Sequence, residues 1–150
     1  MNLTNYYWYF QSAIPERICD EIVKYGKSIS DEMAVTGGFG GNQKLNQNQI
    51  KDLRKKRDSN IVWMNDRWIY KEIQPYVHKA NQNAGWNFDW DWSESCQFTI
   101  YKKGQYYDWH CDSWDKPYAV EGPTKGKIRK LSVTVSLTDP KEYKGGELEF

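Results

Sequence analysis

The sequence lacks any long run of apolar residues. No segment approaches the roughly 20 apolar residues that a helix needs to cross a bilayer. The first ten residues, MNLTNYYWYF, also lack the basic region followed by an apolar stretch that marks an export signal. We therefore expect a soluble protein of the cytoplasm, without a membrane partner.

Cysteine and histidine are scarce. The three cysteines, Cys19, Cys96 and Cys111, are odd in number and too widely spaced for a zinc ribbon or a CxxC redox pair. Reduced thiols in a cytosol are the simplest interpretation. One of the two histidines, His78, falls in a helical pattern with no second ligand at metal-binding spacing. A surface or packing role is favoured for it.

The chain has no excess of either charge. Lys and Arg total 21 and Asp and Glu total 20, which gives a net charge of +1, so no overall field attracts nucleic acid. The basic run over residues 54–57 is short, precedes acidic sequence and contains no interleaved aromatics. We interpret this run as solvated surface and find no clear nucleic-acid signal.

The first 85 residues carry helical patterns. Pro15 opens a segment with apolar residues at Ile18 and Ile22, which predicts a helix with a buried stripe. After a short strand at residues 61–64, Asn65 or Asp66 is expected to cap a second helix, which Pro75 should kink or divide. The Gly-, Asn- and Gln-rich residues 36–49 are interpreted as a loop that serves as a lid or a plain connector.

Beyond residue 85 the pattern changes to short β-rich segments, separated by turn-forming sequences. Strands are predicted at residues 86–92, 94–102, 106–112, 130–137 and 147–150. A further short strand is predicted at residues 6–10. A chain of 150 residues fits one domain. We therefore expect a single α+β domain over residues 1–150, with helices in 1–85 and a sandwich or barrel beginning in 86–150.

One short motif carries candidate chemistry. In a strand over residues 106–112, His110 and Asp112 would project to one face and Cys111 to the other, toward the core. An imidazole nitrogen and a carboxylate oxygen can then reach a common point, as in the facial triad that holds non-haem Fe(II). A three-residue pattern also recurs by chance, so ordinary polar residues are the alternative interpretation.

The surroundings of this motif resemble the prolyl-hydroxylase-like branch of the iron(II)/2-oxoglutarate-dependent dioxygenases. The similarity lies in the aromatic strand and glycine turn YKKGQYYDWHCD, the following RKLSVTVSLTDP, and the turn GGELEF. The resemblance implies a double-stranded β-helix, or jelly roll, packed against the N-terminal helices. It further implies Fe(II), 2-oxoglutarate and accessory ascorbate, and hydroxylation of a C–H bond with release of succinate and carbon dioxide.

The resemblance also assigns roles to individual residues. It makes His110 and Asp112 the catalytic metal ligands and Tyr101 a contact of 2-oxoglutarate. Three hydroxyl residues on one face of the next expected strand would line the co-substrate pocket, or equally would face solvent: Ser132, Thr134 and Ser136. Trp109 and Trp114, on either side of the metal pair, would form the wall of a substrate cleft or be ordinary core residues.

Two family residues have no counterpart in these 150 residues. They are the second histidine ligand and the Arg or Lys that pairs with 2-oxoglutarate. We expect a C-terminally truncated chain that is inactive alone, whose full-length form hydroxylates a peptidyl prolyl-type or small-molecule substrate. The alternatives are a degenerate remnant or a non-catalytic jelly-roll binding module, which would have no reason to prefer Fe(II).

Overall fold

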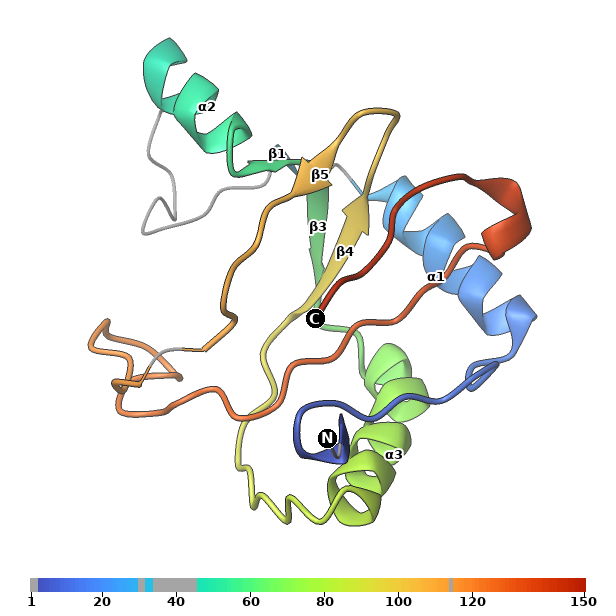
Figure 1. Ribbon diagram of the computed structural model, residues 1–150, viewed down its shortest axis with the longest axis vertical. Helices are drawn as coiled ribbons and strands as arrows, with labels where there is room; N and C mark the ends of the chain where they lie inside the picture. Colours follow the sequence, from blue (N-terminus) through green and yellow to red (C-terminus); the bar gives the residue numbers. More distant parts are fainter. Residues whose placement is uncertain (1–2, 30–31, 34–45, 114) are drawn as a thin grey trace. The chain divides into compact units, whose positions relative to one another are not determined.

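A computed structural model describes residues 3–29, 32–33, 46–113 and 115–150 (Figure 1). Helices, including two short 3-10 helices labelled η, and strands follow one another in this order: η1 (Leu3–Asn5), α1 (Glu16–Ser28), β1 (Glu32–Met33), α2 (Gln47–Arg54), β2 (Arg57–Asp58), β3 (Asn60–Met64), α3 (Arg67–Asn83), β4 (Cys96–Ile100), β5 (Tyr106–Tyr107) and η2 (Pro140–Glu142). This content confirms the α+β class. No helix in the described ranges is long and apolar enough to span a bilayer.

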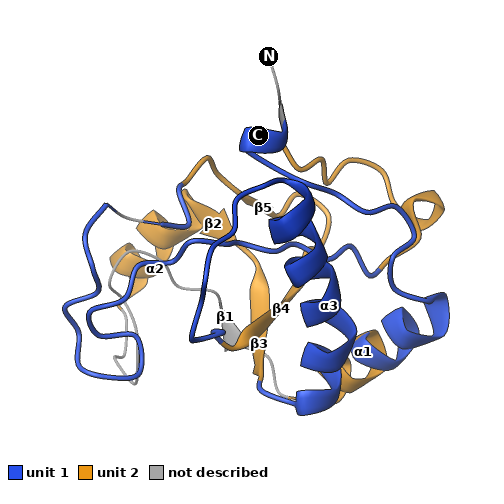
Figure 2. Ribbon diagram, turned by 90° about the horizontal axis from the view of Figure 1, so that it is seen from below, with its two compact units in different colours: residues 1–22, 65–94, 111–137 blue, residues 23–64, 95–110, 138–150 orange. Residues whose placement is uncertain are grey.

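The chain forms two compact units, shown in separate colours in Figure 2. Unit 1 comprises Met1–Ile22, Asn65–Glu94 and Cys111–Leu137. Unit 2 comprises Val23–Met64, Ser95–His110 and Thr138–Phe150.

Unit 2 is built on two small antiparallel sheets. β3 lies between β1 and β4, and Val62 faces Phe98 across the β3–β4 pair. The other sheet pairs β2 with β5, placing Arg57 opposite Tyr107. The core residues Ile61, Val62 and Met64 of β3 are buried, which confirms the strand expected there.

Gly26 on α1 lies close against the strand residues of unit 2. A Cβ atom at this position would lie 2.6 Å from the Phe98 ring and 2.7 Å from the Met64 methyl. The helix can approach these strand residues this closely only because residue 26 has no side chain.

Unit 1 is organised around α3. The Tyr76 hydroxyl donates a hydrogen bond to the Ala13 carbonyl, and its ring packs edge-on against Phe10 with centroids 5.3 Å apart. The Trp86 indole N–H donates to the Thr4 carbonyl over 2.9 Å. These contacts fasten the N-terminal segment to the middle of the helix and to the residues just beyond its end. Phe10 is thereby packed against a helix.

The two long helices follow the predicted periodicity. Ile18 and Ile22 on α1 and Ile69 on α3 are buried, as their spacing indicates. α3 begins after Asp66 and continues through Pro75 as one helix. Of the two outcomes predicted at Pro75, the division is therefore wrong, and the kink stays a prediction. Hydrogen bonds from Tyr70 and Tyr76, one on each side of the proline, hold both halves in place.

The predicted loop over residues 36–49 is partly replaced by helix. Asn46 caps α2 through a reciprocal capping box with Gln49, both hydrogen bonds being 2.9 Å long. Residues 36–45 of the expected loop lie outside the described residues.

Several predicted strands do not form. Residues 6–10, 86–92, 130–137 and 147–150 contain no strand. In the second of these segments the side-chain amide of Asn81 bonds both the N–H and the C=O of Phe88, at 3.0 and 2.8 Å. These are the backbone groups that a neighbouring strand would use. The described residues contain no further sheet, so the jelly roll expected from the resemblance stays a prediction.

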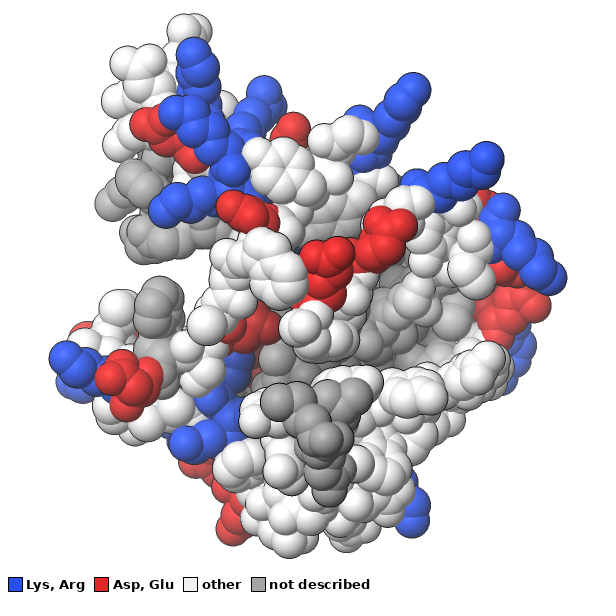
Figure 3. Space-filling view, viewed as in Figure 1, with Lys and Arg blue, Asp and Glu red and all other residues white. Residues whose placement is uncertain are grey.

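Charges of both signs are interspersed on the face shown in Figure 3. This mixture agrees with the balanced composition.

We expect Gly26→Ala to lower the free energy of unfolding by about 1–3 kcal/mol, because the added methyl overpacks the contact with Phe98 and Met64. Urea unfolding followed by circular dichroism measures the change. Lys27→Ala, at an exposed position of the same helix, should change stability by less than about 0.5 kcal/mol. Helix propensity alone predicts that Gly26→Ala stabilises the helix by up to about 1 kcal/mol, so a gain in stability would contradict the packing explanation.

Candidate metal centre

His110 is held in unit 2 by its neighbours in sequence. Its imidazole stacks on the Tyr107 ring, with centroids 3.6 Å apart and planes 15° from parallel. Its Nδ1 lies 2.7 Å from the Asp108 carbonyl oxygen. Because a carbonyl only accepts, Nδ1 carries the proton, and in the neutral ring the lone pair is then on Nε2. A metal would bind this imidazole through Nε2.

The backbone around His110 is not a strand. β5 ends at Tyr107, so the predicted strand over residues 106–112 is wrong beyond that residue. The Asp108 N–H still donates to the Lys56 carbonyl over 2.8 Å, but the next N–H, of Trp109, turns to the Asp108 carboxylate over 2.8 Å. The Asp108 carboxylate thus takes the Trp109 N–H, which a carbonyl of the neighbouring strand would otherwise accept, and the β2–β5 pairing ends here.

Arg57 supports Tyr107 from the opposite strand. Its guanidinium carbon lies 4.4 Å from the centre of the Tyr107 ring, and the residue is only 5 % exposed. A desolvated cation–π contact of this kind contributes about 2 kcal/mol. The interpretation of residues 54–57 as solvated surface is therefore wrong for Arg57. It holds for the exposed side chains of Arg54 and Lys55.

Asp112 is held in unit 1 by two residues of the segment that follows it. The Ser132 hydroxyl donates to Oδ2 of the Asp112 carboxylate, and Nη1 of Arg129 donates to the Asp112 backbone carbonyl. The Ser113 hydroxyl returns a 2.6 Å hydrogen bond to the Arg129 carbonyl. Both the backbone and the carboxylate of Asp112 are thus fastened.

Arg129 is itself fixed by Glu94. Its Nε and Nη2 donate to the two carboxylate oxygens of Glu94 over 2.8 and 2.6 Å, a bidentate pair. This hydrogen bonding raises the pKa of the Arg129 guanidinium, which stays charged at any physiological pH.

Residues 96–150 match the family model of the 2OG-Fe(II) oxygenase superfamily. The match begins at the first residue of β4 and includes His110, Asp112 and Ser132. It supports an oxygenase that uses Fe(II) and 2-oxoglutarate, at the level of the superfamily. No curated protein and no solved structure matches the chain.

The donor types of the candidate centre suit this oxygenase chemistry. A neutral imidazole and a carboxylate are two of the three ligands of a facial Fe(II) triad, and each has the outer hydrogen bond that usually orients such ligands. Within the described ranges no group of three His, Cys, Asp or Glu side chains is placed to hold a metal. The chemical types of the two donors therefore suit Fe(II), each within its own unit.

The residues predicted to contact the co-substrate differ in their hydrogen bonds and in their exposure to solvent. Ser132 bonds the Asp112 carboxylate, while Thr134 and Ser136 are exposed and bond no described residue. Tyr101 in unit 2 is 50 % exposed. Their contact with 2-oxoglutarate stays a prediction.

The aromatic and thiol neighbours of the oxygenase motif are open to solvent where they are described. Trp109 is 71 % exposed and Cys111 is exposed, so the predicted burial of Cys111 is wrong. The strand parity that predicted it does not apply, because β5 ends before this residue. Trp114 lies outside the described residues.

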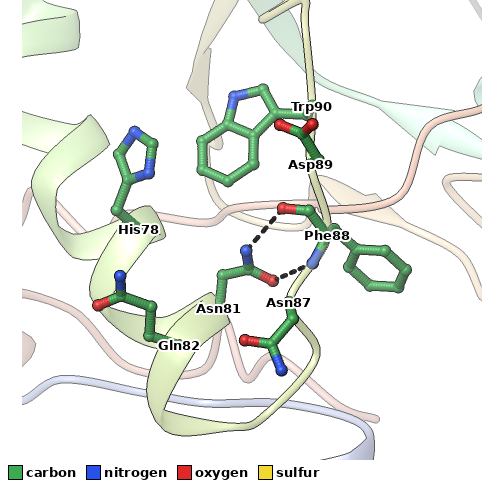
Figure 4. A pocket seen from close by; sticks show the side chains of 7 residues that line it. All are labelled: His78, Asn81, Gln82, Asn87, Phe88, Asp89 and Trp90. Carbon is green, nitrogen blue, oxygen red and sulfur yellow. Dashed lines mark hydrogen bonds between the residues drawn. The ribbon is translucent and has the colours of Figure 1, made fainter.

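A pocket of about 290 Å³ lies elsewhere in unit 1, between α3 and residues 87–90 (Figure 4). The His78 ring lines it and packs on Trp90 with centroids 4.4 Å apart. The residue is exposed, so its setting agrees with the predicted surface or packing role. Asn81, the most buried polar residue of the pocket, is fully engaged with the Phe88 backbone. These hydrogen bonds tie residues 87–90 to α3.

Sequence reasoning missed the supporting residues of the oxygenase motif. Side chains two residues apart in an extended segment point to the same face. Arg57 therefore shares a face with Ser59 and Ile61, which are both buried, and this alternation was a signal for the burial of Arg57. The Arg129–Glu94 pair spans 35 residues, and no local pattern predicts such a contact.

We expect Glu94→Gln to lower the free energy of unfolding by about 0.5–1 kcal/mol, because the bidentate pair is only partly exposed. Urea unfolding at low and high NaCl measures it, and the difference from the unsubstituted chain should shrink at high salt. Glu121→Gln is the matched control, since its pair with Lys125 is local and highly exposed. Equal losses in the two variants would contradict a specific role for Glu94.

Proposed function

We propose that the chain forms an Fe(II)- and 2-oxoglutarate-dependent oxygenase domain of the prolyl-hydroxylase-like type, in which His110 and Asp112 hold the metal. The observation that carries the proposal is the pair of oriented donors. Within the matched residues, one imidazole is bonded at Nδ1 and one carboxylate at Oδ2. Oriented first ligands with outer hydrogen bonds are the usual arrangement in catalytic metal sites.

The chain's residues have distinct tasks in this proposal. Bound Fe(II) and 2-oxoglutarate supply oxygen activation, placing one oxygen atom of O₂ in succinate and the other in a substrate C–H bond, with loss of carbon dioxide. Asp108 orients His110, and Ser132 orients Asp112. Tyr101, with its exposed ring, supplies a hydroxyl to 2-oxoglutarate, and Thr134 and Ser136 line its site.

Substrate and setting are part of the same proposal. The substrate is a peptidyl prolyl-type group or a small molecule, and the exposed ring of Trp109 is available to contact it. The protein acts in the cytoplasm, where its three free cysteines stay reduced. Residues 1–150 belong to a single domain of the jelly-roll type.

The third ligand position decides the activity of these 150 residues alone. The only other histidine of the sequence, His78, packs on Trp90. We propose that the metal is therefore held by two side chains with water at the remaining positions, that its affinity is low, and that turnover by these residues alone is close to zero.

We expect the 150-residue chain to bind Co(II), used as an oxygen-stable stand-in for Fe(II), weakly and with His110 and Asp112. His110→Ala and Asp112→Ala should each reduce the affinity by at least about tenfold, the lower end of the loss seen when even an outer-shell partner is removed. Isothermal titration calorimetry measures the affinity. His78→Ala is the control and should bind Co(II) as the unsubstituted chain does.

Added imidazole tests the third ligand position. If two side chains hold the metal, imidazole should tighten Co(II) binding and shift the visible spectrum, because it supplies the missing nitrogen. Binding that is indifferent to His110→Ala and Asp112→Ala would reject the oxygenase proposal in favour of a non-catalytic binding module. Fe(II) assays with 2-oxoglutarate and ascorbate then measure any turnover directly.

A further inference from the structure

Arg57 is a buried cation without a carboxylate partner among the described residues. Its Nε donates to the Ser59 hydroxyl over 2.9 Å, and Nη1 and Nη2 reach the oxygens of Gln97 and Thr99 at 3.4 and 3.5 Å. All three acceptors are neutral. A buried charge is usually paired with an opposite one, so an arginine kept here needs another source of stabilisation.

The Tyr107 ring supplies that stabilisation. Arg57 and Tyr107 are directly opposite in the β2–β5 ladder, and the guanidinium lies over the ring at 4.4 Å. The negative face of an aromatic ring attracts such a cation. Cross-strand pairing and the cation–π contact together fix the plane of the Tyr107 ring.

His110 occupies the other face of the same ring. Its imidazole is stacked at 3.6 Å, so the guanidinium and the imidazole cannot both lie on one side. Tyr107 is thus enclosed between a buried, hydrogen-bonded cation and the exposed imidazole. Fixing the ring fixes the plane in which His110 lies, and the bond to the Asp108 carbonyl fixes its rotation.

We propose that Arg57 and Tyr107 are positioning residues for His110, which hold its imidazole in the orientation that a metal requires. This inference rests on the proposed function, because it assigns a task to His110 as a ligand. Neither residue touches the metal. Their contribution is the lowered cost of ordering an exposed side chain before the metal arrives.

Leucine at position 107 removes the ring and keeps an apolar side chain. We expect Tyr107→Leu to weaken Co(II) binding by about tenfold, a loss typical of an outer-shell partner. Tyr107→Phe keeps the stacking ring and should recover most of the affinity. Tyr106→Leu is the matched control on the same strand, since the Tyr106 hydroxyl bonds the carbonyls of Arg54 and Lys55, and it should bind as the unsubstituted chain does.

A spectroscopic readout separates positioning from general stability. In the metal-free chain the Tyr107 ring should shift the His110 ring protons upfield in the NMR spectrum, and Tyr107→Leu should abolish the shift while Tyr106→Leu retains it. Arg57→Met, which keeps a flexible buried side chain, should reduce the shift. If Arg57→Met fails to fold, Arg57→Lys tests whether a cation without a planar group suffices, with a reduced shift expected.

The outcomes distinguish the two proposals. His110-dependent Co(II) binding that Tyr107→Leu leaves unchanged, with the ring shift lost, overturns the positioning role and leaves the metal site intact. A chain that shows no His110-dependent binding overturns both. Loss of the shift and of the affinity in Tyr107→Leu, with both retained in Tyr107→Phe and Tyr106→Leu, supports the inference.

Discussion

The burial of one positive charge constrains the arrangement around the candidate centre. Arg57 is removed from water and must be satisfied by groups that the chain itself brings to it: a serine two residues on, neutral side chains from β4, and the ring of the residue opposite. A slip of one residue between β2 and β5 would turn Tyr107 to the other face. Because Arg57 needs the Tyr107 ring opposite it, its burial favours this register of β2 against β5. The register in turn sets the positions of Asp108 and His110, which come directly after β5.

The two proposed ligands are supported by different physical means. His110 depends on ring stacking and a backbone carbonyl, which salt screens little because they involve no exposed pair of opposite charges. Asp112 depends on a network of side chains in which Arg129 is neutralised by a partly exposed glutamate. Support for Asp112 is therefore the more sensitive to ionic strength.

Periodicity predicted the elements that bury their own apolar face. α1, α3 and β3 have buried residues at the expected spacing, because that spacing is a property of one segment. The alternation of apolar and polar residues over residues 130–137 does not predict which strand this segment would pair with. In that stretch Ser132 turns its hydroxyl to Asp112, and at residues 86–92 the amide of Asn81 takes the backbone groups of Phe88. Competition from distant side chains cannot be read from a local pattern.

The same distinction applies to the candidate site. The identity of the donors follows from residue type, since imidazole and carboxylate suit Fe(II) wherever they lie. The expected orienting device was the alternation of a strand, yet β5 ends three residues before His110. Outside a strand the backbone no longer directs the side chain. Orientation must then come from contacts made by each donor separately, and those contacts involve Asp108, Tyr107 and Ser132. A short motif such as His-x-Asp can accordingly recur in many proteins, while the residues that would make it a metal site lie up to 53 positions away, as Arg57 does from His110.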